Sequence, residues 1–307
     1  MKGRNVALRH DAKRGALLML ASTALFTMMS AVVKLVGDRI PFFEIMFFRS
    51  ILALPVVFLI VLRMGGGASL VTQRFPQHVL RAMTGTAAMS CSFFALTVLP
   101  LAEQTALTFT TPLFVTLLAI PLLGEKVGIH RFSAVALGFV GILVIALGKG
   151  AFMGPMDPWI IFGMAVAVAH GVFSAATTLL VRSLSATERS TTIVLWQSLL
   201  MTGFTALTLP FVWVTPNGQE LLLLLVIGVV GGVAQVMLTE AFASAQVSSL
   251  GAYSYTGILW AVLLGWILFG EAPGIATFIG AGLIVLAALY IMRREMIRAA
   301  QKRGTSV

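Results

Sequence analysis

Ionisable side chains are rare in the long apolar segments of this sequence, and one of them is a guanidinium, a group suited to binding anions. Arg49 lies eight residues after Pro41, about 12 Å along a helix that rises 1.5 Å per residue. A charge at such a depth in a bilayer costs about 2.5–3.5 kcal/mol and is usually paired or lines water. We therefore expect Arg49 to face a ligand with an anionic group or to bind a carboxylate of the protein.

Three further ionisable residues, Lys34, Glu44 and Glu103, lie toward the same end of their apolar segments and could form an outer vestibule with Arg49. Glu44 and Arg49 are five residues apart and do not share one helix face well, so Glu103 or a substrate carboxylate is the better partner for the guanidinium. A purely structural ion pair stays open, as does a Lys34 whose amine extends to the membrane surface.

In the second half of the chain the corresponding positions are polar but mostly uncharged. His170 and Gln197 lie well inside apolar segments and are candidate substrate contacts. His170 could titrate near neutral pH and carry a coupling proton, or it could simply bond a backbone carbonyl. Glu240, near the inner end of its segment, is a candidate coupling residue or an interfacial carboxylate.

Aromatic and proline residues add candidates of lower chemical specificity. Phe114 and Trp260 could stack on a planar ligand or contact a cation, although phenylalanine and tryptophan are also ordinary lipid-facing residues. Pro112 removes one hydrogen bond from its helix, so we expect a hinge there.

The elements that carry these residues follow from composition and segment length. Of 307 residues, 59% are hydrophobic and 10% charged, whereas soluble domains have about 25% charged residues, so the chain is expected to be an all-α integral membrane protein. A spanning helix needs roughly 20 mostly apolar residues. Ten segments qualify: Gly15 to Val36, Pro41 to Leu62, His78 to Leu99, Leu101 to Leu123, Arg131 to Leu147, Pro158 to Leu180, Ser190 to Val212, Leu221 to Ala243, Ser248 to Phe269 and Ile275 to Met292.

Lysine and arginine residues gather in alternate connectors. With a cytoplasmic N-terminus, inner segments hold 17 of the 21, Arg81 among them. By the positive-inside rule this distribution predicts a multi-pass protein of the inner membrane with both termini cytoplasmic. The net charge of +10 then needs no nucleic-acid partner. The basic start could belong to a cleaved signal peptide, but nine further apolar segments follow, so we interpret the first as a helix.

The chain contains an internal repeat. A shift of 146 residues aligns 95–145 with 241–291 without gaps, and 15 of the 51 positions are identical, including Gly124-Glu125 with Gly270-Glu271. Two repeats are predicted, residues 1–148 and 149–307. Because each holds five spans, an odd number, the second repeat is inverted in the membrane, an arrangement that places a substrate site near the midplane between halves that alternate in access.

The paired pattern of an apolar helix, then Gly-Glu, then a final helix with small residues (Gly138 and Gly141; Gly280 and Gly282) resembles the EamA domain of the drug/metabolite transporter superfamily, present twice. The resemblance implies a ten-helix carrier of small organic molecules, among which the superfamily handles amino acids, vitamins such as riboflavin, S-adenosylmethionine, sugars and drugs. The repeats differ where TTPLF in the first corresponds to TGILW in the second, so no substrate transfers from the family.

Other classes of function fit less well. An intramembrane enzyme would need a catalytic motif, and the sequence has no HExxH and no GxSxG. The single cysteine, Cys91, excludes a multi-cysteine metal site, and no metal or cofactor is expected. A channel or a carrier of lipid-like molecules could use the same helices. We expect a secondary transporter of a small organic metabolite in the lipid bilayer, with proton coupling, exchange, facilitated diffusion, direction and oligomeric state open.

Overall fold

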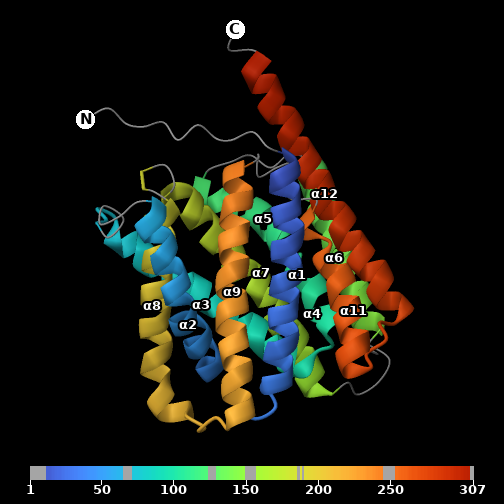
Figure 1. The fold of residues 1–307 in the computed structure, drawn as a ribbon. Helices are drawn as coiled ribbons and strands as arrows, with labels where there is room; N and C mark the ends of the chain where they lie inside the picture. The colour runs from blue at the N-terminus through green and yellow to red at the C-terminus, as the bar shows by residue number, and fades with distance from the viewer. Residues whose placement is uncertain are drawn as a thin grey trace, which may run out of the picture.

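The computed structural model describes residues 12–64, 71–123, 129–148, 157–184, 187–188, 190–244 and 253–304, and these fold into a bundle of long α-helices (Figure 1). No strand occurs among the described residues. In chain order the helices are α1 (Ala12–Val36), α2 (Phe42–Met64), α3 (Phe75–Val98), α4 (Leu101–Thr108), α5 (Thr111–Leu123), α6 (Ile129–Gly148), α7 (Pro158–Leu184), α8 (Ser190–Val212), α9 (Gly218–Ser244), α11 (Gly257–Phe269) and α12 (Ile275–Gly304).

Length and apolar composition make this a membrane bundle. Seven helices, α1, α2, α3, α7, α8, α9 and α12, contain stretches long and apolar enough to cross a bilayer, while α6 and α11 hold shorter apolar stretches. The bounds of α8 coincide with the segment predicted from the sequence. Helix α12 runs on to Gly304, past the predicted end of the apolar segment at Met292.

The segment Leu101–Leu123, expected as one helix, is divided into α4 and α5 by a turn at Phe109 and Thr110. Pro112 is the second residue of α5, where it has no N–H to continue the preceding helix and disfavours helical geometry at Thr111. The Thr108 carbonyl, which would have accepted an N–H from position 112, instead accepts the Thr111 hydroxyl at 2.9 Å. The expected hinge is thus a break between two helices rather than a bend inside one.

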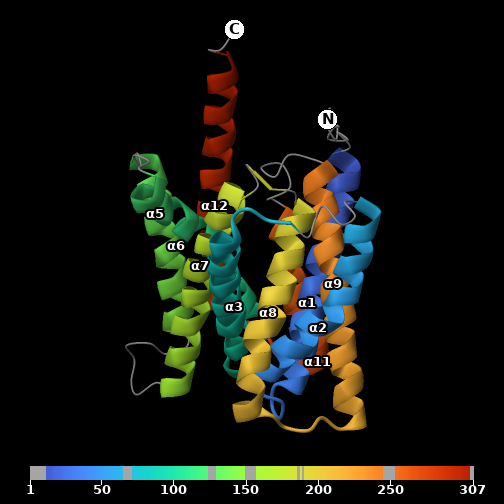
Figure 2. The same ribbon diagram turned by 90° about the vertical axis from the view of Figure 1, so that its left-hand side faces the viewer.

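Helices distant in sequence pack along one another. Helix α1 runs beside α9, α3 beside α7 and α6 beside α12, while α2 lies against both α8 and α9 (Figures 1 and 2). Helix α1 begins and α12 ends at the same end of the bundle, and α7 begins at the opposite end (Figure 2).

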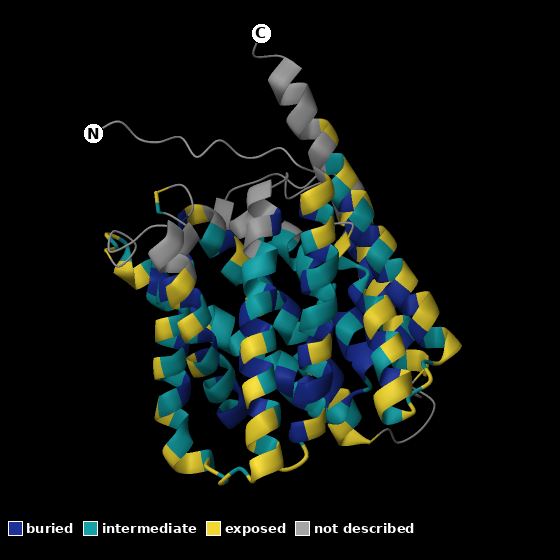
Figure 3. Cartoon of the chain, viewed as in Figure 1, coloured by how far each residue is buried: buried dark blue, intermediate teal, exposed yellow. Residues whose placement is uncertain are grey.

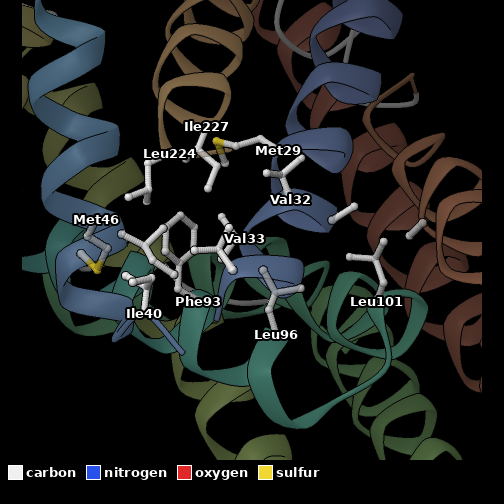
Figure 4. Close-up of a cluster of buried hydrophobic side chains, with 14 residues drawn as sticks. Met29, Val32, Val33, Ile40, Met46, Phe93, Leu96, Leu101, Leu224 and Ile227 are labelled. Atoms are coloured by element: carbon white, nitrogen blue, oxygen red, sulfur yellow. The ribbon is translucent and has the colours of Figure 1, made fainter. Parts of the chain in front are cut away.

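Burial follows the expectation for a helical membrane protein. Exposed residues lie mainly on the outward faces of the helices and buried ones on the faces turned toward the bundle (Figure 3). The largest buried cluster gathers where α1 and α3 end and α2 and α9 begin (Figure 4). Its members include Met29, Val33, Ile40, Met46, Phe93, Leu96, Leu101, Leu224 and Ile227. This cluster closes the bundle at the end where α1 finishes.

Candidate functional site

Arg49 lies on the inner side of α2, facing α9 and α1. A Cβ built on Gly231 of α9 would lie 3.5 Å from Arg49 Nε and 2.8 Å from the sulfur of Met29 on α1, so the absence of a side chain at Gly231 makes room for the guanidinium. The Nε atom is buried and has no hydrogen-bond partner. Among the described residues no carboxylate forms an ion pair with Arg49. The charge is therefore embedded in an apolar helix without a described counter-charge.

The two carboxylates expected near Arg49 bind elsewhere. Glu103, buried on α4, accepts a hydrogen bond from the Thr277 hydroxyl of α12 at 3.2 Å. Glu44, buried at the start of α2, accepts the Val214 backbone N–H beyond the end of α8 at 2.9 Å. The expected pairing of Arg49 with Glu103 is not formed, because α4 packs against α7, α11 and α12 rather than against α2.

Lys34 lies near the end of α1 in a link between distant segments. Its ammonium is 2.6 Å from Glu271 Oε1 and donates to the Leu99 carbonyl at 2.7 Å. Glu271 Oε2 accepts the backbone N–H of Leu101, the first residue of α4, at 2.9 Å. A carboxylate at this position satisfies a helix N-terminus. The lysine assigned to a vestibule with Arg49 is thus joined to a carboxylate of the repeated Gly-Glu pair.

The two polar candidates from the second half of the chain, His170 and Gln197, both contact α3. His170 of α7 donates from Nδ1 to the Ala88 carbonyl at 2.8 Å, which leaves Nε2 as its proton acceptor. Gln197 of α8 lies against Gly85, where a Cβ would be 2.9 Å from its amide nitrogen. Arg81 donates to the Gln197 side-chain oxygen.

Sequence reasoning missed the role of Arg81, because the count of Lys and Arg in the loops placed it in a connector. In the structure Arg81 lies inside α3. One turn further along the same face, the Thr177 hydroxyl of α7 donates to the Thr84 hydroxyl at 2.9 Å. Together these contacts form a polar seam between α3, α7 and α8. The signal that could have revealed it is the spacing of Arg81, Thr84 and Ala88, which share one helical face.

The aromatic candidates differ in their surroundings. Phe114 packs inside the bundle: a Cβ on Gly171 of α7 would lie 2.9 Å from its ring, and it contacts Phe139 edge-on at 5.7 Å between centroids. Trp260, in contrast, is 37% exposed on α11. The side chain of Glu240 lies outside the described residues.

Two turns of the chain meet in the bundle, one at Phe109 and Thr110 and the other at Tyr255 and Thr256. The ring of Phe109, between α4 and α5, lies 4.9 Å from that of Tyr255, just before α11. Discontinuous helices and an unneutralised cation are typical of membrane carriers with a site in the bundle. Among the described residues no group of three histidine, cysteine or acidic side chains gathers as a metal site.

Comparison with known proteins identifies the family. The model of the EamA-like transporter family matches the chain twice, over residues 13–147 and 161–293, and the chain belongs to that family. A solved crystal structure with 22% sequence identity superposes with a TM-score of 0.65, covering 92% of this chain and 98% of the other, which supports the fold.

Curated relatives match over nearly their whole length. A riboflavin transporter of Vibrio cholerae is 30% identical over 97% of this chain and 99% of its own, and a pseudopaline exporter of Pseudomonas aeruginosa is 30% identical over 92% and 97%. An S-adenosylmethionine uptake transporter of Rickettsia felis is 28% identical over 91% of each. These relatives are transporters and exporters rather than enzymes, and this chain is a multi-pass transporter of small metabolites.

Proposed function

We propose that the chain is a secondary transporter of ten spans, in which two inverted repeats, residues 1–148 and 149–307, alternately expose one site near the bilayer midplane. The bounds of α5 and α11 differ by 146 residues at both ends, and those of α2 and α8 by 148 at both ends. The family model also matches once in each half. These regularities support a duplication that extends beyond the aligned sequence.

The packing supports an approximate two-fold relation between the repeats. Helix α1 lies along α9 in the same way that α7, its counterpart, lies along α3. Phe109 and Tyr255, whose rings touch, are themselves 146 residues apart. Gly231 beneath Arg49 and Gly85 beneath Gln197 are also separated by 146. Because α1 and α7 begin at opposite ends, the relation inverts the second repeat (Figure 2).

Arg49 is the residue to which we assign the substrate's anionic or zwitterionic group. The single observation that carries this assignment is a guanidinium inside an apolar span with no described counter-charge, since such a charge is costly unless a partner or water reaches it. The relatives handle riboflavin, pseudopaline and S-adenosylmethionine, so we infer an amphipathic metabolite of that size. Further proposed contacts are Glu103, His170, Gln197, Phe114 and Trp260.

Coupling and gating are assigned to Lys34, Glu44, Glu240 and Pro112. His170 is the candidate for a coupling proton, because its Nδ1–H is committed to Ala88 and Nε2 is left to accept one. We also propose that the chain lies in the inner membrane with both termini in the cytoplasm, as the distribution of Lys and Arg favours.

The experiment is counterflow in proteoliposomes of the purified chain, with riboflavin, S-adenosylmethionine, amino acids and nucleosides as probes selected by thermal shift. A carrier gives saturable, trans-stimulated uptake, whereas ion-like conductance without counterflow would identify a channel instead. Arg49→Ala is expected to abolish uptake of the active probe while Arg49→Lys, which keeps the charge, retains part of it. Near-normal uptake by folded Arg49→Ala would remove the role assigned to Arg49.

A further inference from the structure

A second arginine in the bundle has no role in the function proposed so far. Arg81 lies six residues after the start of α3, about 9 Å along the helix. Its Nη1 donates to the side-chain oxygen of Gln197 on α8, and its Nε is buried without a hydrogen-bond partner. An amide oxygen carries no net charge, so this contact orients the guanidinium without neutralising it.

The acidic residue that approaches this end of α3 is already engaged. Glu188 lies 2.8 Å from Nε2 of His78 through Oε2, and its Oε1 accepts the hydroxyl of Thr72. In the part of the chain that the structure describes, Glu188 makes no ion pair with Arg81. Arg81, like Arg49, is a membrane cation whose described neighbours supply no counter-charge.

Two further buried polar atoms without partners belong to residues next to Gln197 and Gly85 in the sequence. Besides Nε of Arg81, the indole nitrogen of Trp196 beside Gln197 and the hydroxyl of Thr86 on α3 are buried and lack hydrogen bonds. Buried polar groups are bonded in the great majority of cases, so the unbonded Nε of Arg81 marks a place that water or a ligand can reach. Gly85 leaves the space into which the Gln197 amide fits.

The two arginines lie at different depths. Helix α2 begins at the end of the bundle where α1 finishes, and α3 begins at the opposite end (Figure 2). Arg49 is about 10 Å from the start of α2 and Arg81 about 9 Å from the start of α3, so their backbones lie on opposite sides of the middle of helices roughly 35 Å long. Two cations placed in this way suit successive sites along a path rather than one shared pocket.

We propose that Arg81, oriented by Gln197, is a second anion-binding residue of the transport path, which receives a carboxylate or phosphate group of the substrate at the end of the bundle where α3 begins. This inference rests on the proposed function for the identity of the ligand as a transported metabolite. The anion site itself can be tested without transport, by measuring whether water-soluble charged reagents reach it and whether anionic ones are favoured.

The test uses the full chain with Cys91, its single cysteine, replaced by alanine and a reporter cysteine introduced as Thr86→Cys. Purified protein is reacted with the negatively charged methanethiosulfonate ethylsulfonate and with its positively charged trimethylammonium analogue. A guanidinium nearby attracts the anionic reagent, and we expect Arg81→Gln to lower the ratio of anionic to cationic rates about tenfold. Arg81→Lys, which retains the charge, should keep the ratio.

Two further variants separate this role from simple packing. Gln197→Glu places a carboxylate against the guanidinium and should abolish the anionic preference in a folded protein. Arg74→Gln, which loses bonds to Ser183 and Thr187 outside the seam, should leave the preference unchanged. Folding of each variant is checked by size-exclusion chromatography.

The anion site would be overturned if the cysteine at position 86 does not react in the folded protein. It would also be overturned if the ratio of anionic to cationic rates is the same with and without Arg81→Gln. In counterflow, an anionic probe that is transported equally by the parent and by Arg81→Gln would also overturn it. Absence of any counterflow, with the charge preference intact, would instead refute the carrier and leave the anion site standing.

Discussion

Glu188 shows how a single carboxylate joins two connectors at one end of the bundle. Burial raises the pKa of Glu188, but hydrogen bonds from the side chains of Thr72 and His78 outweigh this effect, and the pKa is lowered below its ordinary value. A carboxylate whose pKa is lower in the folded state stabilises the fold above its unfolded pKa, which is about 4.3, and the stabilisation is lost as the pH falls through the folded value.

We therefore expect Glu188→Gln to lower the melting temperature at pH 6–7 and to differ progressively less from the parent as the pH falls below about 4.5. Thermal unfolding in detergent, followed from pH 3.5 to 7, measures this convergence. A difference between the two proteins that is independent of pH would contradict the ionic part of the contact. Asp38→Asn, an exposed carboxylate at the opposite end of the bundle, serves as the control outside this network.

At the scale of elements, α6 and α12 approach so closely that two glycines make the crossing possible. A Cβ on Gly280 would lie 2.5 Å from the Gly141 carbonyl oxygen, and a Cβ on Gly141 would lie 2.6 Å from that of Gly280. Both clashes involve backbone, which cannot move aside as a side chain can. Close approach through small residues is a common mode of helix association in membranes.

Gly280→Ala should therefore lower the melting temperature by several degrees, since overpacking costs about 1–3 kcal/mol. The matched control is Gly282→Ala on the same helix, where a Cβ meets nothing within 4 Å and alanine favours the helix by about 0.5–1 kcal/mol. Both variants are compared by thermal unfolding in the same detergent. Equal stability of the two would show that the helices separate more readily than the geometry indicates.

The link through Glu271 joins α1 and α4 to the end of α11, and the two carboxylate oxygens of Glu271 have different partners. One oxygen binds the Lys34 ammonium and the other accepts the Leu101 N–H. Glu271→Gln removes the charge but keeps an acceptor for Leu101, whereas Glu271→Ala removes both contacts. We expect the alanine variant to be the less stable, because it leaves the N-terminus of α4 uncapped. Indistinguishable melting temperatures would reduce the link to an electrostatic contact.

At the scale of the whole molecule, the alternating directions of the helices predict sidedness. Sidedness is tested with three single-cysteine variants, Asp157→Cys, Asn217→Cys and Thr187→Cys, each in the Cys91→Ala background. Positions 157 and 217 precede α7 and α9 at one end of the bundle, and position 187 follows α7 at the other end (Figure 2). An impermeant maleimide added to intact cells should label the first two and miss Thr187. Labelling of all three from one side would refute the proposed topology and the inverted repeat with it.

Much of the helical layout could be predicted, because the required information is local. The length of an apolar run determines whether it can cross a bilayer, and α8 was predicted with its observed bounds. The division of Leu101–Leu123 was expected only as a hinge at Pro112, since one proline does not specify whether a helix bends or ends.

The partners of the polar residues were predicted less well. The depth of Arg49 in its helix could be predicted from the number of residues after Pro41. The lack of a contact between Arg49 and Glu103 could not, because residue spacing identifies neighbours only within one helix. Lys34 and Glu271 are 237 residues apart, and Arg81 and Gln197 are 116 apart. No local pattern encodes such a pair.

The amino-acid sequence by itself determined a helical membrane protein, its internal repeat and the presence of charges where hydrocarbon disfavours them, since composition and periodicity act within each segment. Only the tertiary structure decided which charges are neutralised: Lys34 meets Glu271, while Arg49 and Arg81 meet no described carboxylate. Those outcomes depend on the rotation and register of helices packed side by side, which are set by contacts between all of them at once.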